Sequence, residues 1–186
     1  MRRPLLVFED IRTTPRHKLF TLHGVQWMAT PYAWLSLPFW CFLGILTAFV
    51  GERDASTEGC LLVGLGYGVL LALTNVIHSL GHVVASRLIG APMDAILMTA
   101  TRNINLHLKD QSRYAKGIHI GRALGGPLLN IAVGLVCFAV GKLSQNEWLA
   151  TFALFNVVIG IFTLFPLPSV DGWVIWGELL GFRRRA

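Results

Sequence analysis

Four long apolar stretches dominate the chain and are separated by polar segments. Their approximate limits are Tyr32–Val50, Cys60–Ser86, Ala123–Gly141 and Trp148–Leu167. A helix that crosses the hydrocarbon core of a bilayer needs about 20 apolar residues, and each stretch is close to or above that length. The pattern therefore predicts an all-α polytopic membrane protein with about four transmembrane helices.

Shorter patterns between these stretches predict the connecting structure. Asn103–Leu108 alternates polar and apolar residues, which is typical of a half-buried strand. We therefore expect a short membrane-associated β segment in the loop between the second and third spans. Its edge could accept an extended peptide by strand addition, or the segment could form a small self-paired hairpin that binds nothing. In the N-terminal arm we expect an interfacial helix around Leu19–Met28. The last apolar segment, Trp173–Leu180, is too short to cross a membrane.

The basic residues are distributed unevenly along this pattern. Fourteen of the 16 Lys and Arg residues lie before the first span, between the second and third, or after the last, and only Arg53 and Lys142 lie in the other two loops. Because Lys and Arg favour the cytoplasmic side, a multi-pass protein of the cell membrane with both termini in the cytoplasm is predicted. We divide the chain into a basic cytosolic arm (1–31), one membrane-embedded domain (32–180) and a basic tail (181–186).

Composition agrees with this assignment. The chain is 54% hydrophobic and 14% charged, whereas soluble domains have about 25% charged residues. The net charge of +6 follows the loops, so we expect contact with anionic lipid headgroups and no nucleic-acid partner. The three cysteines form no C-x-x-C pair and lie in or beside apolar runs, so we expect small apolar packing residues and no disulfide framework.

Candidate chemistry begins with the segment HSLGH at 78–82. Histidines four residues apart project from one face of a helix, which is the spacing that lets two imidazoles bind one zinc ion. The second and fourth spans both run from outside to inside, so Asp171, just after the fourth span, is expected in the same cytoplasmic leaflet as His78 and His82. Three protein ligands and an open position form the arrangement of catalytic zinc. The alternatives are histidines that only pack and an aspartate that caps the following helix.

Three motifs together resemble the site-2 proteases, which are membrane-embedded zinc metalloproteases that cut transmembrane segments of their substrates. HSLGH resembles the H-E-x-x-H of the family, LGGPLLN at 124–130 resembles its glycine-proline-asparagine segment, and LFPLPSVDG at 164–172 resembles its N-x-x-P-x-P-x-x-D-G. The resemblance covers roughly 60–180. It implies a Zn²⁺ cofactor with His78, His82 and Asp171 as ligands, and a transmembrane segment of another protein as substrate or partner.

Two positions depart from the family pattern. Ser79 occupies the place of the catalytic glutamate, and Thr163 that of the asparagine in the aspartate motif, although Asn156 lies seven residues earlier on the same helix face. Thr74, four residues before His78, and Asn130 are further polar residues that we expect either around the metal or in contacts between helices.

Because a serine does not act as a base near neutral pH, three hypotheses follow. The first is a zinc-binding pseudoprotease that binds transmembrane substrates with lost or much reduced peptidase activity. The second is an active metalloendopeptidase with a displaced general base, which the sequence allows to be Glu178, Asp94, His107 or His119. The third is a non-enzymatic membrane protein in which the histidines serve packing or ion passage. Loss of a positioned general base costs about 10²–10⁴-fold in rate.

Overall fold

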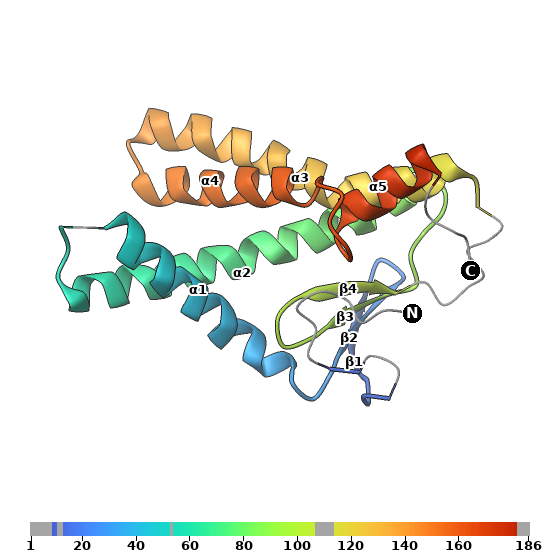
Figure 1. Cartoon of the computed structure of the whole chain (residues 1–186), viewed down its shortest axis with the longest axis horizontal. Coiled ribbons are helices and arrows are strands. Elements are labelled where there is room, and N and C mark those ends of the chain that lie inside the picture. The colour runs from blue at the N-terminus through green and yellow to red at the C-terminus, as the bar shows by residue number, and fades with distance from the viewer. Residues whose placement is uncertain (1–8, 11–12, 53, 107–113, 182–186) are drawn as a thin grey trace.

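The computed structural model describes residues 9–10, 13–52, 54–106 and 114–181. Five α-helices and a four-stranded sheet make up this part of the chain (Figure 1). The helices are α1 (Ser36–Gly51, preceded by the 3₁₀ turn Ala33–Leu35), α2 (Thr57–Leu88), α3 (Lys116–Ser144), α4 (Glu147–Phe162) and α5 (Asp171–Leu180). The strands are β1 (His17–Leu22), β2 (Val25–Ala29), β3 (Ala95–Met98) and β4 (Asn103–Leu106).

Three of the helical segments in the described residues are long and apolar enough to cross a membrane. They are Ala33–Gly51, α2 and α3. The fourth expected span, Trp148–Leu167, is shorter than predicted, because α4 ends at Phe162. Its 16 residues measure about 24 Å, against a hydrocarbon core of about 30 Å. The backbone turns between α4 and α5, where two prolines could not continue the helix.

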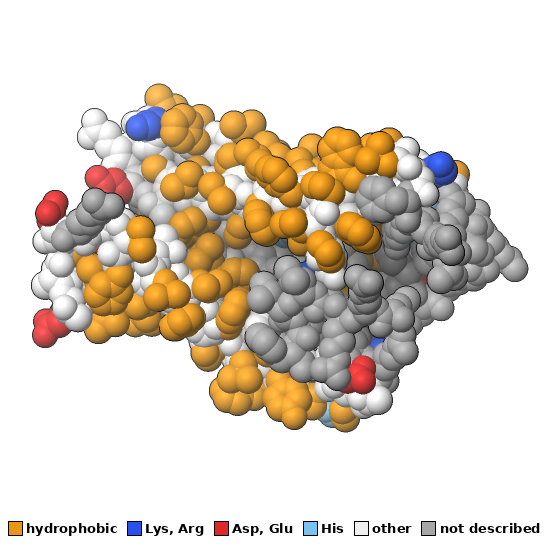
Figure 2. Space-filling model, viewed as in Figure 1, with side chains coloured by type: hydrophobic (Ala, Val, Ile, Leu, Met, Phe, Trp, Pro, Cys, Tyr) orange, Lys and Arg blue, Asp and Glu red, His pale blue; other side chains and the backbone are white. Residues whose placement is uncertain are grey.

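Small residues bring the long helices into contact. Gly44 on α1 faces Gly64 and Gly68 on α2, and Gly81 on α2 faces Gly125 on α3, with no room for a Cβ at any of them. Such contacts allow close backbone approach between membrane helices, where van der Waals packing provides much of the association energy. Large apolar side chains instead cover the outside of the helices (Figure 2), as expected for a surface that faces lipid.

The sheet corrects the expectation for the N-terminal arm. Leu19–Met28 is not an interfacial helix: β1 and β2 form an antiparallel hairpin whose turn residues, His23 and Gly24, both have positive φ. A two-residue turn of this kind matches the natural twist of two strands. On β2, Val25 and Trp27 are buried on alternate positions, which is the period of a strand rather than of a helix.

The strand predicted at Asn103–Leu108 is confirmed as β4 for Asn103–Leu106, and 107–108 lie outside the described residues. It is part of a larger sheet than expected. The strand order is β1-β2-β3-β4, in which β2 and β3 are parallel and the other pairs are antiparallel. The arm and the middle loop therefore fold together into one sheet.

The sheet packs on the C-terminal half of α2. Val25 and Trp27 of β2 and Ile96 of β3 form a buried cluster with Val83 of α2 and with Met93. In Figure 1, α1 and the sheet lie below α2, while α3 and α4 lie above it. The last turns of α2 are thus enclosed between the sheet and α3, and these turns carry the two histidines.

Candidate metal centre

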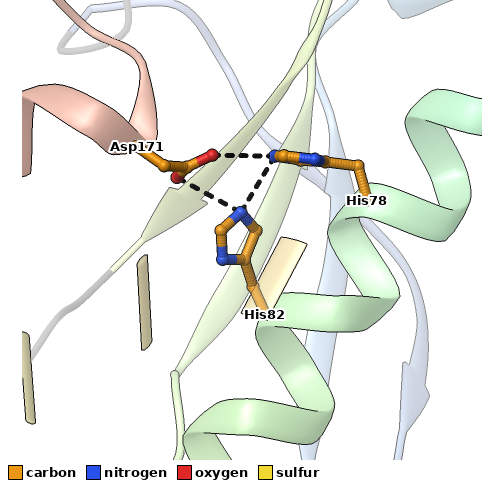
Figure 3. Close-up of side chains that lie close together, drawn as sticks. All are labelled: His78, His82 and Asp171. Carbon is orange, nitrogen blue, oxygen red and sulfur yellow. Dashed lines mark hydrogen bonds and ion pairs between the residues drawn. The ribbon is translucent and has the colours of Figure 1, made fainter. Parts of the chain in front are cut away.

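Three side chains from two distant segments converge at the C-terminal half of α2 (Figure 3). His78 and His82 project from the same face of α2, with their Nε2 atoms 3.1 Å apart. The Asp171 carboxylate, from the first residue of α5, lies 2.9 Å from His78 Nε2 through Oδ2 and 3.3 Å from His82 Nε2 through Oδ1. Among the described residues, this is the one group of three or more His, Cys, Asp or Glu side chains close enough to hold a metal ion.

The loop between α4 and α5 places Asp171 beside α2. The Gly172 N–H donates to the Thr163 carbonyl at 2.7 Å, and Trp176 Nε1 donates to the Leu164 carbonyl at 3.0 Å. These bonds fold the start of α5 back onto the end of α4. Asp171 is the first helical residue, and no side chain caps the helix. Its carboxylate therefore faces the histidines instead of serving as the helix cap.

The dimensions of this group fit a tetrahedral zinc ion. Ligand bonds of about 2.0–2.1 Å put neighbouring ligands of a tetrahedron about 3.3 Å apart. The two Nε2 atoms are 3.1 Å apart, and one carboxylate oxygen lies 2.9 Å from His78 Nε2 while the other lies 3.3 Å from His82 Nε2. Gly126 on α3 leaves room beside them, since a Cβ there would lie 2.5 and 2.6 Å from the Nε2 atoms of His82 and His78. Two imidazoles and a carboxylate are also a donor set that zinc accepts.

Hydrogen bonds on the far side of the rings favour the same arrangement. His82 Nδ1 donates to the Arg122 carbonyl at 2.8 Å, which leaves the Nε2 lone pair for a metal. His78 Nδ1 lies 3.4 Å from the Asn130 amide nitrogen, while Asn130 Oδ1 is buried and has no partner among the described residues. Rotating this amide by 180° would let Oδ1 accept from His78 Nδ1–H, so both rings could present Nε2 to the metal.

The charges around the Asp171 carboxylate favour its ionised form. Burial raises the pKa of the Asp171 carboxyl, but the charges and hydrogen bonds of His82 and His78 outweigh burial and hold that pKa well below its usual range. The guanidinium of Arg102 also interacts with this carboxylate, which opposes the lowering of the Arg102 pKa by burial. Asp171 is therefore ionised, as a metal ligand must be.

Ser79 is engaged in a contact between α2 and the sheet. Its hydroxyl donates to the Asn75 carbonyl at 3.0 Å and accepts from Asn103 Nδ2, at the start of β4, at 2.8 Å. The residue is buried, with 2% of its surface exposed. The hydroxyl thus already has both a donor and an acceptor partner, and it connects α2 to β4.

The other polar residues singled out in the sequence divide into two groups. Asn130 approaches His78, as described above. Thr74 and Asn156 contact each other instead: Asn156 Nδ2 donates to Thr74 Oγ1 at 3.2 Å, and both side chains are fully buried between α2 and α4. The Thr163 hydroxyl donates to the Gly160 carbonyl of its own helix at 3.1 Å. The hydrogen bonds of Thr74, Asn156 and Thr163 are thus contacts within or between helices.

Of the four residues considered as replacement bases, the three that the structure describes lie outside the His-His-Asp group. Glu178 is buried on α5, seven residues after Asp171, and therefore about 10 Å further along the helix on the same face. Asp94 precedes β3, and the His119 ring stacks edge-on with Tyr114. His107 lies outside the described residues.

Sequence reasoning missed three residues that surround the centre. The loop charges predict only topology for Arg102, yet it interacts with Asp171 and donates from Nη2 to the Ser169 carbonyl at 2.8 Å. The alternating pattern predicts only a strand residue at Asn103, whose side chain donates to Ser79, and Arg122 contributes its backbone carbonyl. An alternating pattern marks a strand but does not say which helix its polar face meets, and no sequence signal marks a carbonyl acceptor.

Known proteins resemble the chain in both sequence and fold, although no protein-family model matches it. Over 117 residues, or 60% of this chain, it is 27% identical to a zinc metalloprotease of Methanocaldococcus jannaschii, of which it spans 33%. Its fold resembles the structure of a site-2 protease from the same organism, with a TM-score of 0.62 and 19% identity over 91% of this chain and 73% of that one. The resemblance inferred from the three motifs is thus confirmed.

Proposed function

We propose that this chain, which has the fold of the site-2 proteases, holds a zinc ion with His78, His82 and Asp171 and binds a transmembrane segment of another protein. We further propose that its peptidase activity is lost or much reduced. One observation carries the proposal. The three ligand atoms converge within 4.8 Å of one another, while Ser79, at the glutamate position, is tied to Asn103 of the sheet.

When bound, the zinc would act as a Lewis acid and lower the pKa of a water molecule in its open position. Peptide hydrolysis also needs a group that takes a proton from that water and passes it to the leaving nitrogen. Ser79 lacks the basicity for this role.

The edge strand β4 supports the choice of partner. It lies at one end of the strand order and begins beside Ser79. An extended segment that paired with β4 would run close to the metal centre, with backbone hydrogen bonds supplying affinity. A transmembrane helix that unwinds locally at the membrane surface could supply such a segment. The chain would then hold its partner without cutting it.

The length of α2 supports a location near the cytoplasmic face. We propose a multi-pass protein of the cell membrane in which α4 makes a short fourth crossing, so that both termini lie in the cytoplasm. His78 is 21 residues after Thr57, which is about 31 Å along the helix, close to the thickness of the hydrocarbon core. The centre would lie in the cytoplasmic leaflet, and the basic segments beside it would contact anionic lipid headgroups.

A second function is an active intramembrane metalloendopeptidase with a displaced general base. The fold and the retained His-His-Asp group favour it, together with the zinc metalloprotease among the relatives. Among the candidates in the described part of the chain, Glu178 is the best placed, because it shares a face of α5 with Asp171. This function requires α5 or a partner to bring a carboxylate to the metal.

The deciding experiment measures zinc and cleavage on the same purified protein. We expect about one zinc per chain, lost in His82→Ala, and no cleavage of a reporter transmembrane substrate. Ser79→Glu restores a base at the family position, and Ser79→Gln is its control, with the same size and no basicity. Both variants exchange a buried serine for a larger side chain, so their folding is checked by thermal unfolding.

The outcomes separate the functions. Cleavage that depends on zinc in the unmodified chain would reject the pseudoprotease and support the active enzyme, and its loss in Glu178→Gln would identify the base. Activity gained by Ser79→Glu and not by Ser79→Gln supports the proposal directly. If the unmodified protein, purified without chelators, contains no zinc, the result would support the non-enzymatic hypothesis in which the histidines bind no metal.

A further inference from the structure

The turn between β3 and β4 connects the N-terminal arm to the loop that carries Asp171. This turn comprises Thr99–Arg102 and is closed by its own hydrogen bonds: the Thr99 N–H and hydroxyl donate to the Arg102 carbonyl at 3.1 and 2.7 Å. Thr99, Ala100 and Thr101 are all buried. A closed and buried turn transmits displacement from one side to the other, because it has little freedom to deform.

On one side of the turn, Arg102 reaches the metal-ligand loop. Its Nη2 donates to the carbonyl of Ser169, two residues before Asp171. Its charge also interacts with the Asp171 carboxylate and with both histidines. Ser169 has a φ of +68°, a conformation that an L residue rarely adopts without support. Arg102 therefore holds a strained point of the chain next to a proposed ligand.

On the other side, Glu9 of the arm is docked into the turn. Its Oε1 accepts from the Ala100 N–H at 2.9 Å, although the two residues are 91 positions apart. The glutamate is 8% exposed, and its Oε2 has no partner among the described residues. Burying a carboxylate costs free energy unless its contacts compensate. The hydrogen bond to the Ala100 N–H is one such contact, and it fixes the glutamate against the turn.

We propose that Arg102 and Glu9 are positioning residues for the metal centre: Glu9 holds the β3–β4 turn, and through it Arg102 holds the Ser169–Asp171 segment in the geometry that binds zinc. The inference rests on the proposed zinc site. It goes beyond it by assigning the N-terminal arm a part in metal affinity. A cytosolic partner that bound the arm could then raise or lower the zinc affinity of the centre.

Two effects of Arg102 oppose each other. Its charge repels a zinc ion, whereas its hydrogen bond orders the loop of the carboxylate ligand. We expect ordering to prevail, because the attraction between Arg102 and the Asp171 carboxylate offsets the repulsion of the metal, while a misplaced ligand loses the metal bond itself. Removing groups that orient metal ligands typically costs about 10–100-fold in affinity.

The test measures the zinc dissociation constant of the full-length protein in detergent by competition with a chelating dye. We expect Arg102→Met to weaken binding by about 10-fold or more, and Arg102→Lys, which keeps a donor and the charge, to recover most of the loss. Glu9→Ala should weaken binding by about fivefold, as for one lost hydrogen bond. Because both act through one turn, the double variant should bind no worse than Arg102→Met alone.

Control variants distinguish a failure of the proposed zinc site from a failure of the positioning role. Arg87→Met and Glu58→Gln remove exposed charges of the same kind from α2 and should leave the affinity unchanged. Thermal unfolding of each variant shows whether it folds. If the unmodified chain binds no zinc, the proposed function fails. If it binds zinc and Arg102→Met binds as tightly or more tightly, or the two losses add fully, the positioning role is overturned.

Discussion

Gly126→Ala should abolish zinc binding without altering any ligand. A Cβ at this position would lie 2.5 Å from His82 Nε2, 2.6 Å from His78 Nε2 and 2.7 Å from His78 Cε1. Carbon and nitrogen atoms that are not bonded approach to about 3.5 Å, so the methyl group must push both ring ends away by roughly 0.9 Å. Metal sites tolerate deviations of about 0.2 Å in ligand distance. The displacement is several times larger than that tolerance.

The same substitution should leave the fold intact. The clashing atoms are the far ends of histidine side chains, which can rotate without moving the helix backbone. Gly117→Ala on the same helix is the matched control, because a Cβ there meets nothing within 4 Å. We expect near-stoichiometric zinc in the unmodified chain and in Gly117→Ala, and little in Gly126→Ala. Normal zinc affinity in a folded Gly126→Ala variant would refute the site geometry.

Three further predictions test neighbouring parts of the molecule. Asn130→Leu should weaken zinc binding by about 10–100-fold, because it removes the group that can orient His78, and an unchanged dissociation constant would contradict that role. Asn156→Leu should leave zinc affinity unchanged and shift the free energy of unfolding by less than about 1.5 kcal/mol, since the lost bond to Thr74 is offset by removing an unpartnered buried oxygen; a large loss of zinc would place Asn156 at the centre. Gly68→Ala should destabilise the α1–α2 contact and lower the unfolding temperature with zinc affinity kept, and equal unfolding temperatures would count against close packing there.

The sequence was most informative where a short pattern has one physical outcome. Apolar runs of 20 residues gave long helices, and alternation gave the strand at Asn103. The histidine spacing placed His78 and His82 on one helix face. The lengths of the helices were predicted less reliably than their positions, because the apolar run beyond Phe162 contains prolines and folds into a loop. The helix predicted for Leu19–Met28 is wrong, because the segment contains the turn residues His23 and Gly24, which form a hairpin.

The sequence by itself thus determined the membrane character, the histidine pair and the three motifs, because hydrophobic length and helical period act locally along the chain. Only the tertiary structure decided what meets these residues. It brought Asp171 to the histidines, engaged Ser79 with Asn103, and connected Glu9 through the β3–β4 turn to Arg102. Such contacts join segments up to 93 residues apart. They depend on how helices and sheet pack, and packing is a property of the whole fold, which no local pattern contains.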